Sequence, residues 1–154
     1  MTSGDSKKIY FHYLKGSFYF PNRNKMKGFI LYLFKNEGFQ VDTINFIFCS
    51  DSHLHALNKE YLKHDTYTDI VTFHYSQPPQ SILSDIYISV DRIRENAKTF
   101  DVPFIHELYR VMFHGALHLC GYKDKSGTDQ TLMRAKENFY LGKYVPREIK
   151  VPKS

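Results

Sequence analysis

The chain has 154 residues, a length that suits one compact domain, and apolar residues make up 42% of it, which is enough to build a core. It contains no run of about 18 apolar residues, so no membrane span is expected. Its polar start carries no apolar signal segment, and two cysteines, Cys49 and Cys120, cannot build a disulfide framework. We therefore expect a cytoplasmic protein without a membrane partner. The net charge of +5 is compatible with a polyanionic partner.

Apolar spacing and capping residues predict an irregular mixture of strands and helices. In chain order they are a strand over residues 9–14, a helix over 23–36, a strand over 41–49, a helix that begins after Ser50 or Asp51, strands over 69–75 and 85–90, and helices over 91–99, 104–120 and 129–140. Thr128 is the candidate N-cap of the last helix. Residues 141–154 contain two prolines and are expected to form a loose tail. The mixture predicts one α+β domain, residues 1–154, with a small mixed β-sheet packed with helices.

The chemistry is concentrated between His114 and Asp124, in the segment HGALHLCGYKD. His114 and His118 are four residues apart, so on a helix they share one face, about 6 Å apart along the axis, and can converge on one metal ion. This is the spacing of a zincin-like metal helix, but Gly115 stands where HExxH peptidases carry the glutamate that acts as general base. Cys120 falls on a different side of the helix and is not expected to be a ligand.

A glycine is expected to end this helix and reverse the chain. Gly121 tolerates the positive φ that a sharp reversal requires, and the following loop can then return Asp124 to an ion held by His114 and His118. Three protein ligands leave a position open for water, which is typical of a catalytic site. Taken alone, Asp124 could equally form an ion pair or a cap.

Two neighbours on the same helix are candidates for supporting roles. Arg110 lies four residues before His114 and could neutralise a substrate phosphate or a developing oxyanion, which makes it the tentative catalytic residue beside a metal-bound water. Glu107 could orient Arg110 or a ligand. An ordinary surface pair between Glu107 and Arg110 is an equally good interpretation. The remaining histidines are expected to be ordinary unless the fold brings one in: His12, His53, His55, His64, His74 and His106.

The segment from His114 to Asp124 resembles the signature of the YbeY family, H-G-x-L-H-L-x-G-Y-D-H. Two upstream segments are also similar to family motifs, L-N-x-x-Y-R-x-x-D-x-P-T-D-V-L-S-F and G-D-I-x-I-S. They consist here of Leu57, Asn58, Tyr61, Asp65, Thr68, Asp69, Ile70, Val71, Thr72 and Phe73, and of Asp85, Ile86, Ile88 and Ser89. The resemblance implies an α+β fold and a single-strand endoribonuclease that matures ribosomal RNA and acts with the small ribosomal subunit. It also implies zinc, with His114 and His118 as ligands.

The chain departs from the family motifs at two informative places. The family's third histidine falls at Asp124, and we expect this carboxylate to replace it as a ligand; the alternative is that Lys123 is an insertion and the third ligand is lost. A carboxylate there is expected to acidify bound water less and to admit harder ions such as manganese. The family's arginine is Leu62 here, so Lys63 is an imperfect replacement. Lys63 and Thr68 are the expected substrate-binding residues.

Residues 7–35 are basic and rich in aromatic rings. They carry seven cationic side chains and no acidic one, with Tyr10, Phe11, Tyr13, Phe18, Tyr19 and Phe20 among them. Exposed rings beside cations can stack on unpaired bases and attract phosphates. The alternative is that the rings fill the core while the cations are solvated.

Three functions fit these patterns. The leading hypothesis is metal-dependent hydrolysis of RNA phosphodiester bonds by a metal-activated water. The second is a zincin-type metallopeptidase, which the missing glutamate at Gly115 disfavours. The third is a non-catalytic RNA-binding ribosome-assembly factor whose metal is structural, which Leu62 in place of the family's arginine keeps open.

Overall fold

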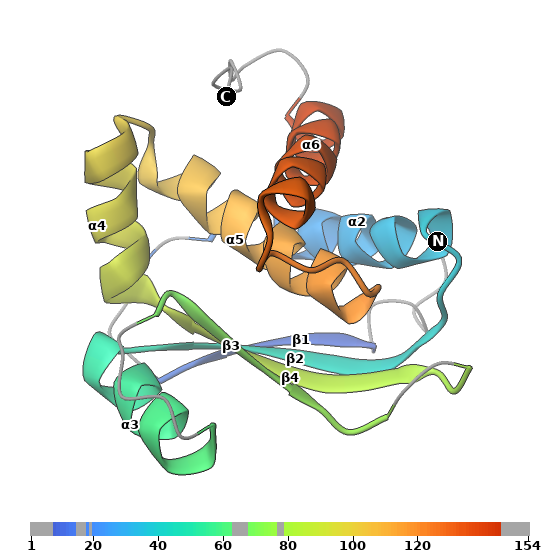
Figure 1. Ribbon diagram of the computed structural model, residues 1–154, viewed down its shortest axis with the longest axis horizontal. Helices are drawn as coiled ribbons and strands as arrows, with labels where there is room; N and C mark the ends of the chain where they lie inside the picture. The colour runs from blue at the N-terminus through green and yellow to red at the C-terminus, as the bar shows by residue number, and fades with distance from the viewer. Residues whose placement is uncertain (1–7, 15–17, 19, 63–67, 77–78, 146–154) are drawn as a thin grey trace.

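The computed structural model of the chain describes residues 8–14, 18, 20–62, 68–76 and 79–145. Within these residues it has one four-stranded sheet and five helices (Figure 1). The strands are β1 (Ile9–Tyr13), β2 (Val41–Cys49), β3 (Ile70–His74) and β4 (Ile82–Ser89). The helices are α2 (Arg23–Asn36), α3 (Asp51–Tyr61), α4 (Val90–Phe100), α5 (Phe104–Leu119) and α6 (Gly127–Tyr144).

The sheet is mixed, as the sequence predicts. Its strand order is β1-β2-β4-β3; β1, β2 and β4 are parallel and β3 is antiparallel to β4. The inner strand β2 ends in a nearly continuous apolar run, from Phe46 to Cys49, that is buried throughout. Such runs are typical of strands covered on both faces. The prediction of an α+β domain with a small mixed sheet is therefore confirmed.

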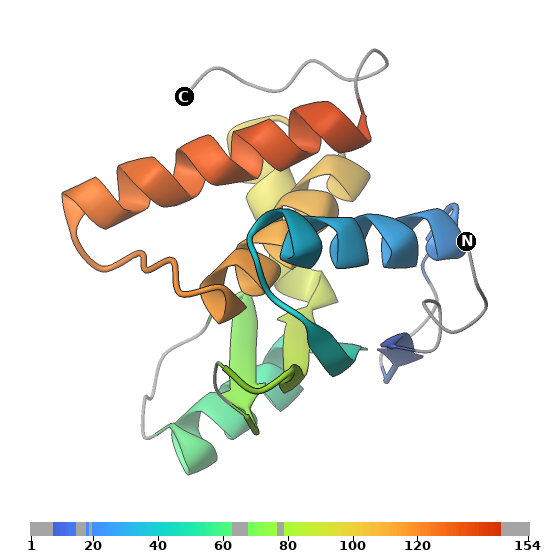
Figure 2. The same ribbon diagram turned by 90° about the vertical axis from the view of Figure 1, so that its right-hand side faces the viewer.

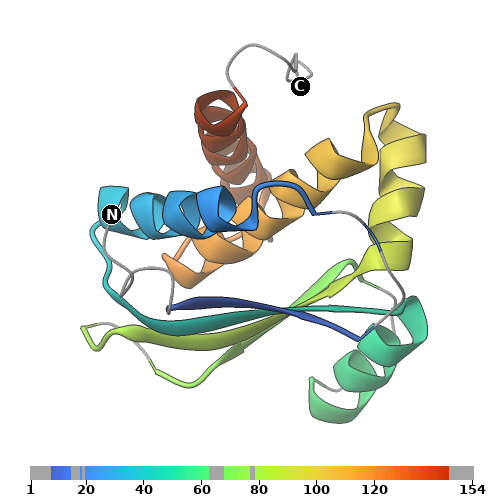
Figure 3. The same ribbon diagram turned by 180° about the vertical axis from the view of Figure 1, so that it is seen from behind.

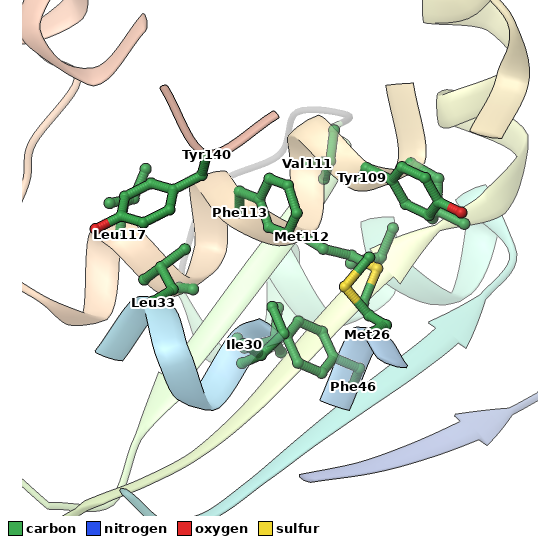
Figure 4. Packing of buried hydrophobic residues seen from close by; sticks show 14 of the residues in the cluster. Met26, Ile30, Leu33, Phe46, Tyr109, Val111, Met112, Phe113, Leu117 and Tyr140 are labelled. Atoms are coloured by element: carbon green, nitrogen blue, oxygen red, sulfur yellow. The ribbon is translucent and has the colours of Figure 1, made fainter. Parts of the chain in front are cut away.

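Helix α5 lies between the sheet and α6, with α2 beside it (Figures 1 and 2). The view from behind shows α2 crossing in front of α5 on the same side of the sheet (Figure 3). Figure 4 shows Met26 and Ile30 of α2 meeting Phe46 of the sheet and Phe113 of α5 in the core. A helix buried on most of its surface is a rigid support for side chains on its one accessible face.

Several predicted boundaries shift. Ser50 is the N-cap of α3 and accepts from the His53 amide, which settles the choice between Ser50 and Asp51. Strand β4 begins at Ile82 rather than at residue 85. Thr128 is not the cap of the last helix, because Ser126 caps it in a box with Asp129.

The prediction of a loose tail from residue 141 is wrong for residues 141–145. Helix α6 continues to Tyr144, and Leu141, Tyr144 and Val145 are buried. The two prolines of the tail suggested an irregular segment, but a helix can run up to the residues just before a proline. The rest of the predicted tail, 146–154, lies outside the described residues. Among the described helices, none is both long and apolar enough to cross a membrane.

Candidate metal centre

The two histidines of the motif lie on one face of α5, as predicted. The rings of His114 and His118 are nearly parallel, 5° apart, with centroids separated by 6.4 Å. The helix ends one residue after His118, and Gly121 adopts a positive φ of 101°. The Tyr122 amide donates back to the Leu117 carbonyl at 3.2 Å, which closes the reversal that the glycine permits. The loop then runs toward α6 (Figure 1), and Asp124 within it comes back to contact His114.

His114 is oriented by a buried carboxylate from the neighbouring helix. Its Nδ1 lies 2.8 Å from Oε2 of Glu137 on α6. An ionised carboxylate only accepts hydrogen bonds, so Nδ1 carries the proton and Nε2 carries the lone pair of the neutral ring. Burial lowers the pKa of His114, but the hydrogen bond and charge of Glu137, with the charges of Asp124 and Asp69, outweigh burial and raise it. Metal-ligating histidines are usually supported in this way, by a hydrogen bond from the other ring nitrogen to a carboxylate.

His118 is oriented by the main chain of the same loop. Its Nδ1 lies 3.0 Å from the carbonyl oxygen of Tyr122. A carbonyl oxygen also only accepts, so His118 donates from Nδ1 and its Nε2 has the lone pair when the ring is neutral. When neutral, each imidazole therefore has its lone pair on Nε2.

Asp124 faces the second ring nitrogen of His114. Its Oδ2 is 3.2 Å from Nε2 of His114, so two lone-pair atoms face each other unless a proton or a metal ion lies between them. Two ligands of a tetrahedral zinc ion with bonds of about 2.0–2.1 Å are about 3.3 Å apart, so the donor types and this spacing fit a metal. Among the described residues, no three His, Cys, Asp or Glu side chains lie close enough together to hold a metal ion as they stand. His118, whose ring lies parallel to that of His114 one turn along α5, is the remaining candidate ligand.

Arg110 lines the same cleft as His114, and its guanidinium is paired with side chains of α6. Its guanidinium donates to Oε1 of Glu137 at 2.9 Å and to the side-chain oxygen of Asn138 at 2.9 Å, both on α6. The interpretation of a surface pair with Glu107 is wrong, because Glu107 is only 5% exposed and Arg110 pairs with Glu137 instead. Sequence spacing favoured partners on α5 and could not show that α6 packs along it. Arg110 therefore supports His114 through their shared carboxylate.

A buried carboxyl, Glu107, and a partly buried one, Asp69, line the cleft beside the histidines. Burial raises the pKa of Glu107 to about 7, with the positive charge of Arg110 opposing it and the charges of Asp69 and Glu137 adding to it. Burial likewise raises the pKa of Asp69 above its ordinary value, against the charge of His114. Neither carboxyl was singled out for this role by the sequence, because burial at these positions depends on how α5 packs against α4, α6 and β3.

The fold brings one more histidine near the pair. His74, at the end of β3, has its ring centroid 6.2 Å from that of His118. Burial and the nearby charge of His118 lower the pKa of His74. No spacing signal links these residues, because their approach depends on the position of β3 at the edge of the sheet. Burial, reinforced by the charge of Glu37, raises the pKa of the Cys120 thiol to about 12, which disfavours its thiolate form.

The candidate centre opens into a cleft of about 740 Å³ whose walls come from α3, β3, α4, α5, α6 and the loop before α6. Thr68 lines it, and the Thr68 hydroxyl donates to the Ile70 carbonyl at 3.3 Å. Leu62, which stands where the family has arginine, lines it as well. Lys63 lies outside the described residues. Two cationic side chains that the sequence did not single out, Lys125 and Arg134, also line the cleft.

The aromatic residues near the N-terminus mostly serve the core. Phe11, Phe18 and Phe20 pack on one another and on Phe48 of β2, and Lys27 lies over the Phe11 ring. This favours the core interpretation for these rings. Tyr19 lies outside the described residues.

Gly115 faces the sheet. A Cβ placed on it would lie 2.8 Å from Cδ1 of Ile70 and 3.3 Å from Cγ2 of Ile86. The position that carries the general base in HExxH peptidases is therefore packed against β3 and β4, and has no room for a carboxylate here. The metallopeptidase hypothesis loses its necessary residue for a steric reason as well as a chemical one.

The chain is similar to known proteins both in sequence and in fold. The family model described as "Endoribonuclease YbeY" matches residues 21–145. A protein named endoribonuclease YbeY from Amoebophilus asiaticus is 43% identical over 133 residues, covering 86% of this chain and 90% of the relative. Another of that name from Flavobacterium psychrophilum is 56% identical over 104 residues, covering 68% and 71%. The solution structure of a Thermotoga maritima protein has the same fold, with a TM-score of 0.61, 24% identity and coverage of 95% and 99%.

The fold and these matches define a nuclease of the hydrolase class. The chain belongs to the YbeY family of endoribonucleases. The family, the fold class and the enzyme class predicted from the sequence are therefore confirmed.

Proposed function

We propose that this chain cleaves single-stranded RNA with the help of one divalent metal ion, expected to be zinc, held by His114, His118 and Asp124. The observation that carries this proposal is the 3.2 Å approach of Nε2 of His114 to Oδ2 of Asp124. Both imidazoles have their other nitrogen committed to an acceptor, Glu137 or the Tyr122 carbonyl. A cation between the two facing lone pairs removes their repulsion.

Each part of the cleft has a role in this proposal. A bound ion would polarise a phosphoryl oxygen and lower the pKa of a water. Glu137 holds His114 in the ligating tautomer and neutralises Arg110. Lys125 and Arg134 attract the phosphates of the strand, since cationic groups in a cleft raise the local concentration of a polyanion.

The RNA substrate follows from the family. We propose ribosomal RNA as the substrate, the small ribosomal subunit as the partner and the cytoplasm as the location, because the relatives are named endoribonucleases and the chain is basic, with a net charge of +5. The departures from the family motifs, Asp124 and Leu62, lie in the cleft and do not remove the proposed ligand set.

The test is cleavage of a labelled single-stranded RNA by protein stripped of metal and then reloaded with zinc or manganese. The reloaded wild type is expected to cut the single strand, to spare the matched duplex and to lose activity with a chelator. His118→Ala, purified in parallel, is the control for contaminating nucleases and is expected to be inactive. Equal cleavage by wild type and His118→Ala would reject the proposal. RNA binding without cleavage by fully loaded wild type would instead support the ribosome-assembly factor.

A further inference from the structure

A carboxylate at the end of α2 accepts hydrogen bonds from three side chains that belong to α6 and to the loop after α5. Glu37 is the C-cap of α2, and its side chain is 9% exposed. Its Oε1 accepts from the hydroxyl of Tyr122 at 2.7 Å. Its Oε2 accepts from the Tyr140 hydroxyl and from Nζ of Lys136 at 3.2 Å.

This carboxylate is ionised. Burial raises the pKa of Glu37, but the hydrogen bonds from Tyr140, Tyr122 and Lys136 outweigh burial and lower it below its ordinary value. Hydrogen bonds to a charged acceptor are stronger than neutral ones. Glu37 and its three partners form a cluster that anchors two separate segments to α2. The loop after α5 is anchored through Tyr122, and α6 through Tyr140 and Lys136.

Tyr122 connects this anchor to the proposed ligands. Its hydroxyl is held by Glu37, while its main-chain carbonyl accepts from Nδ1 of His118 at 3.0 Å. Its amide donates to the Leu117 carbonyl, so the residue is fixed at both ends. Asp124 follows two residues later. The orientation of His118 and the return of the loop to His114 therefore depend on one residue whose side chain points away from the site.

We propose that Glu37 is a positioning residue for the metal centre: by holding the Tyr122 hydroxyl it fixes the carbonyl that orients His118 and the loop that presents Asp124. This inference rests on the proposed function, because it needs an ion held by His114, His118 and Asp124. The hydrogen bonds that support metal-ligating histidines typically contribute 10–100-fold to metal affinity. Glu37 acts indirectly, because it holds Tyr122, whose carbonyl accepts the hydrogen bond from His118.

The cluster supplies its own matched control. Tyr122→Phe and Tyr140→Phe each remove one hydroxyl that donates to the same carboxylate and leave the ring in place. A role limited to folding predicts similar effects of the two changes. A positioning role predicts a difference, because the Tyr122 carbonyl accepts from His118, whereas Tyr140 lies on α6 and its hydroxyl meets Glu37 and Asn36.

The experiment measures zinc affinity of the full chain by competition with a chromogenic chelator, well below the unfolding temperature, and the tautomer of His118 by imidazole ¹⁵N chemical shifts in the metal-free protein. We expect Tyr122→Phe and Glu37→Gln to weaken zinc binding roughly 10-fold and to reduce the population of the Nδ1–H tautomer of His118. Tyr140→Phe is expected to change zinc affinity by less than about 2-fold, although it lowers thermal stability.

Two results would overturn the proposal, and only the second would also reject the proposed function. Equal zinc affinity and an unchanged His118 tautomer in Tyr122→Phe and the wild type would reject the positioning role and leave the proposed function intact. Failure of the wild type to bind zinc or manganese would reject both.

Discussion

His114 on α5 donates to Glu137 on α6 at 2.8 Å, and the same carboxylate accepts from Arg110 at 2.9 Å. One buried carboxylate thus fixes the tautomer of the histidine and balances a buried guanidinium. The bond from His114 also raises the pKa of that ring above its ordinary value, against the effect of burial. The contact between α5 and α6 is therefore part of the site as well as part of the core.

Glu137→Gln is expected to weaken both the fold and the site. Removing the charge leaves Arg110 without its anionic partner, and breaking such a buried pair costs roughly 3 kcal/mol of the free energy of unfolding. Zinc affinity is expected to fall about 10–100-fold, because His114 loses its carboxylate support. Denaturant unfolding and zinc competition measure the two effects. Asn138→Ala removes the other partner of Arg110 and should leave zinc affinity unchanged; a matching loss there would contradict this role of Glu137.

Glu107 predicts a specific pH dependence of stability. Burial raises the pKa of this carboxyl from 4.5 to about 7, so the folded state binds the proton more tightly than the unfolded state. Its stabilising contribution is fully present below pH 4.5 and is lost as the pH rises through 7, by about 3 kcal/mol in total. Glu107→Gln has no titratable carboxyl at this position and therefore does not lose this stability as the pH rises. Denaturant unfolding of metal-free protein at pH 5 and pH 8 should show the variant gaining on the wild type at pH 8, and a constant difference at both pH values would refute the assignment.

At Gly115, a small and a large substitution are expected to change the free energy of unfolding by very different amounts. In Gly115→Ala, the close approach to Cδ1 of Ile70 can be relieved by rotating that side chain, and the gain in helix propensity of about 1 kcal/mol offsets the remaining strain. Gly115→Glu, which restores the residue of HExxH peptidases, places a carboxylate against Ile70 and Ile86 and should cost at least about 3 kcal/mol. Thermal unfolding compares the two. A stable Gly115→Glu variant that cleaves unstructured protein would revive the peptidase hypothesis.

The parts of the site that sequence could predict are those that depend on local geometry. The spacing of His114 and His118 fixes their shared face on any helix, and Gly121 predicts the reversal that returns Asp124. The start of α6 was also readable, since Ser126 and Asp129 have the spacing of a capping box. These features need only the chain within about one helical turn of each residue.

The remaining parts of the site depend on tertiary packing. Glu137 is 23 residues from His114 in sequence and resembles any surface glutamate until α6 is seen to lie along α5. His74 reaches His118 only through the position of β3, and Glu37 reaches Tyr122 across 85 residues. Sequence periodicity predicts which face of an element is apolar, but it does not predict which elements become neighbours.

The central claim is that His114, His118 and Asp124 hold one metal ion. Metal content by elemental mass spectrometry, after stripping and reloading with zinc, tests it on the wild type, His118→Ala and Asp124→Ala, with Lys123→Ala as a neighbouring control. We predict one zinc per chain in the wild type and in Lys123→Ala, and loss of zinc from both other variants. A wild type that retains no metal after reloading, or an Asp124→Ala variant that retains a full equivalent, would contradict the site.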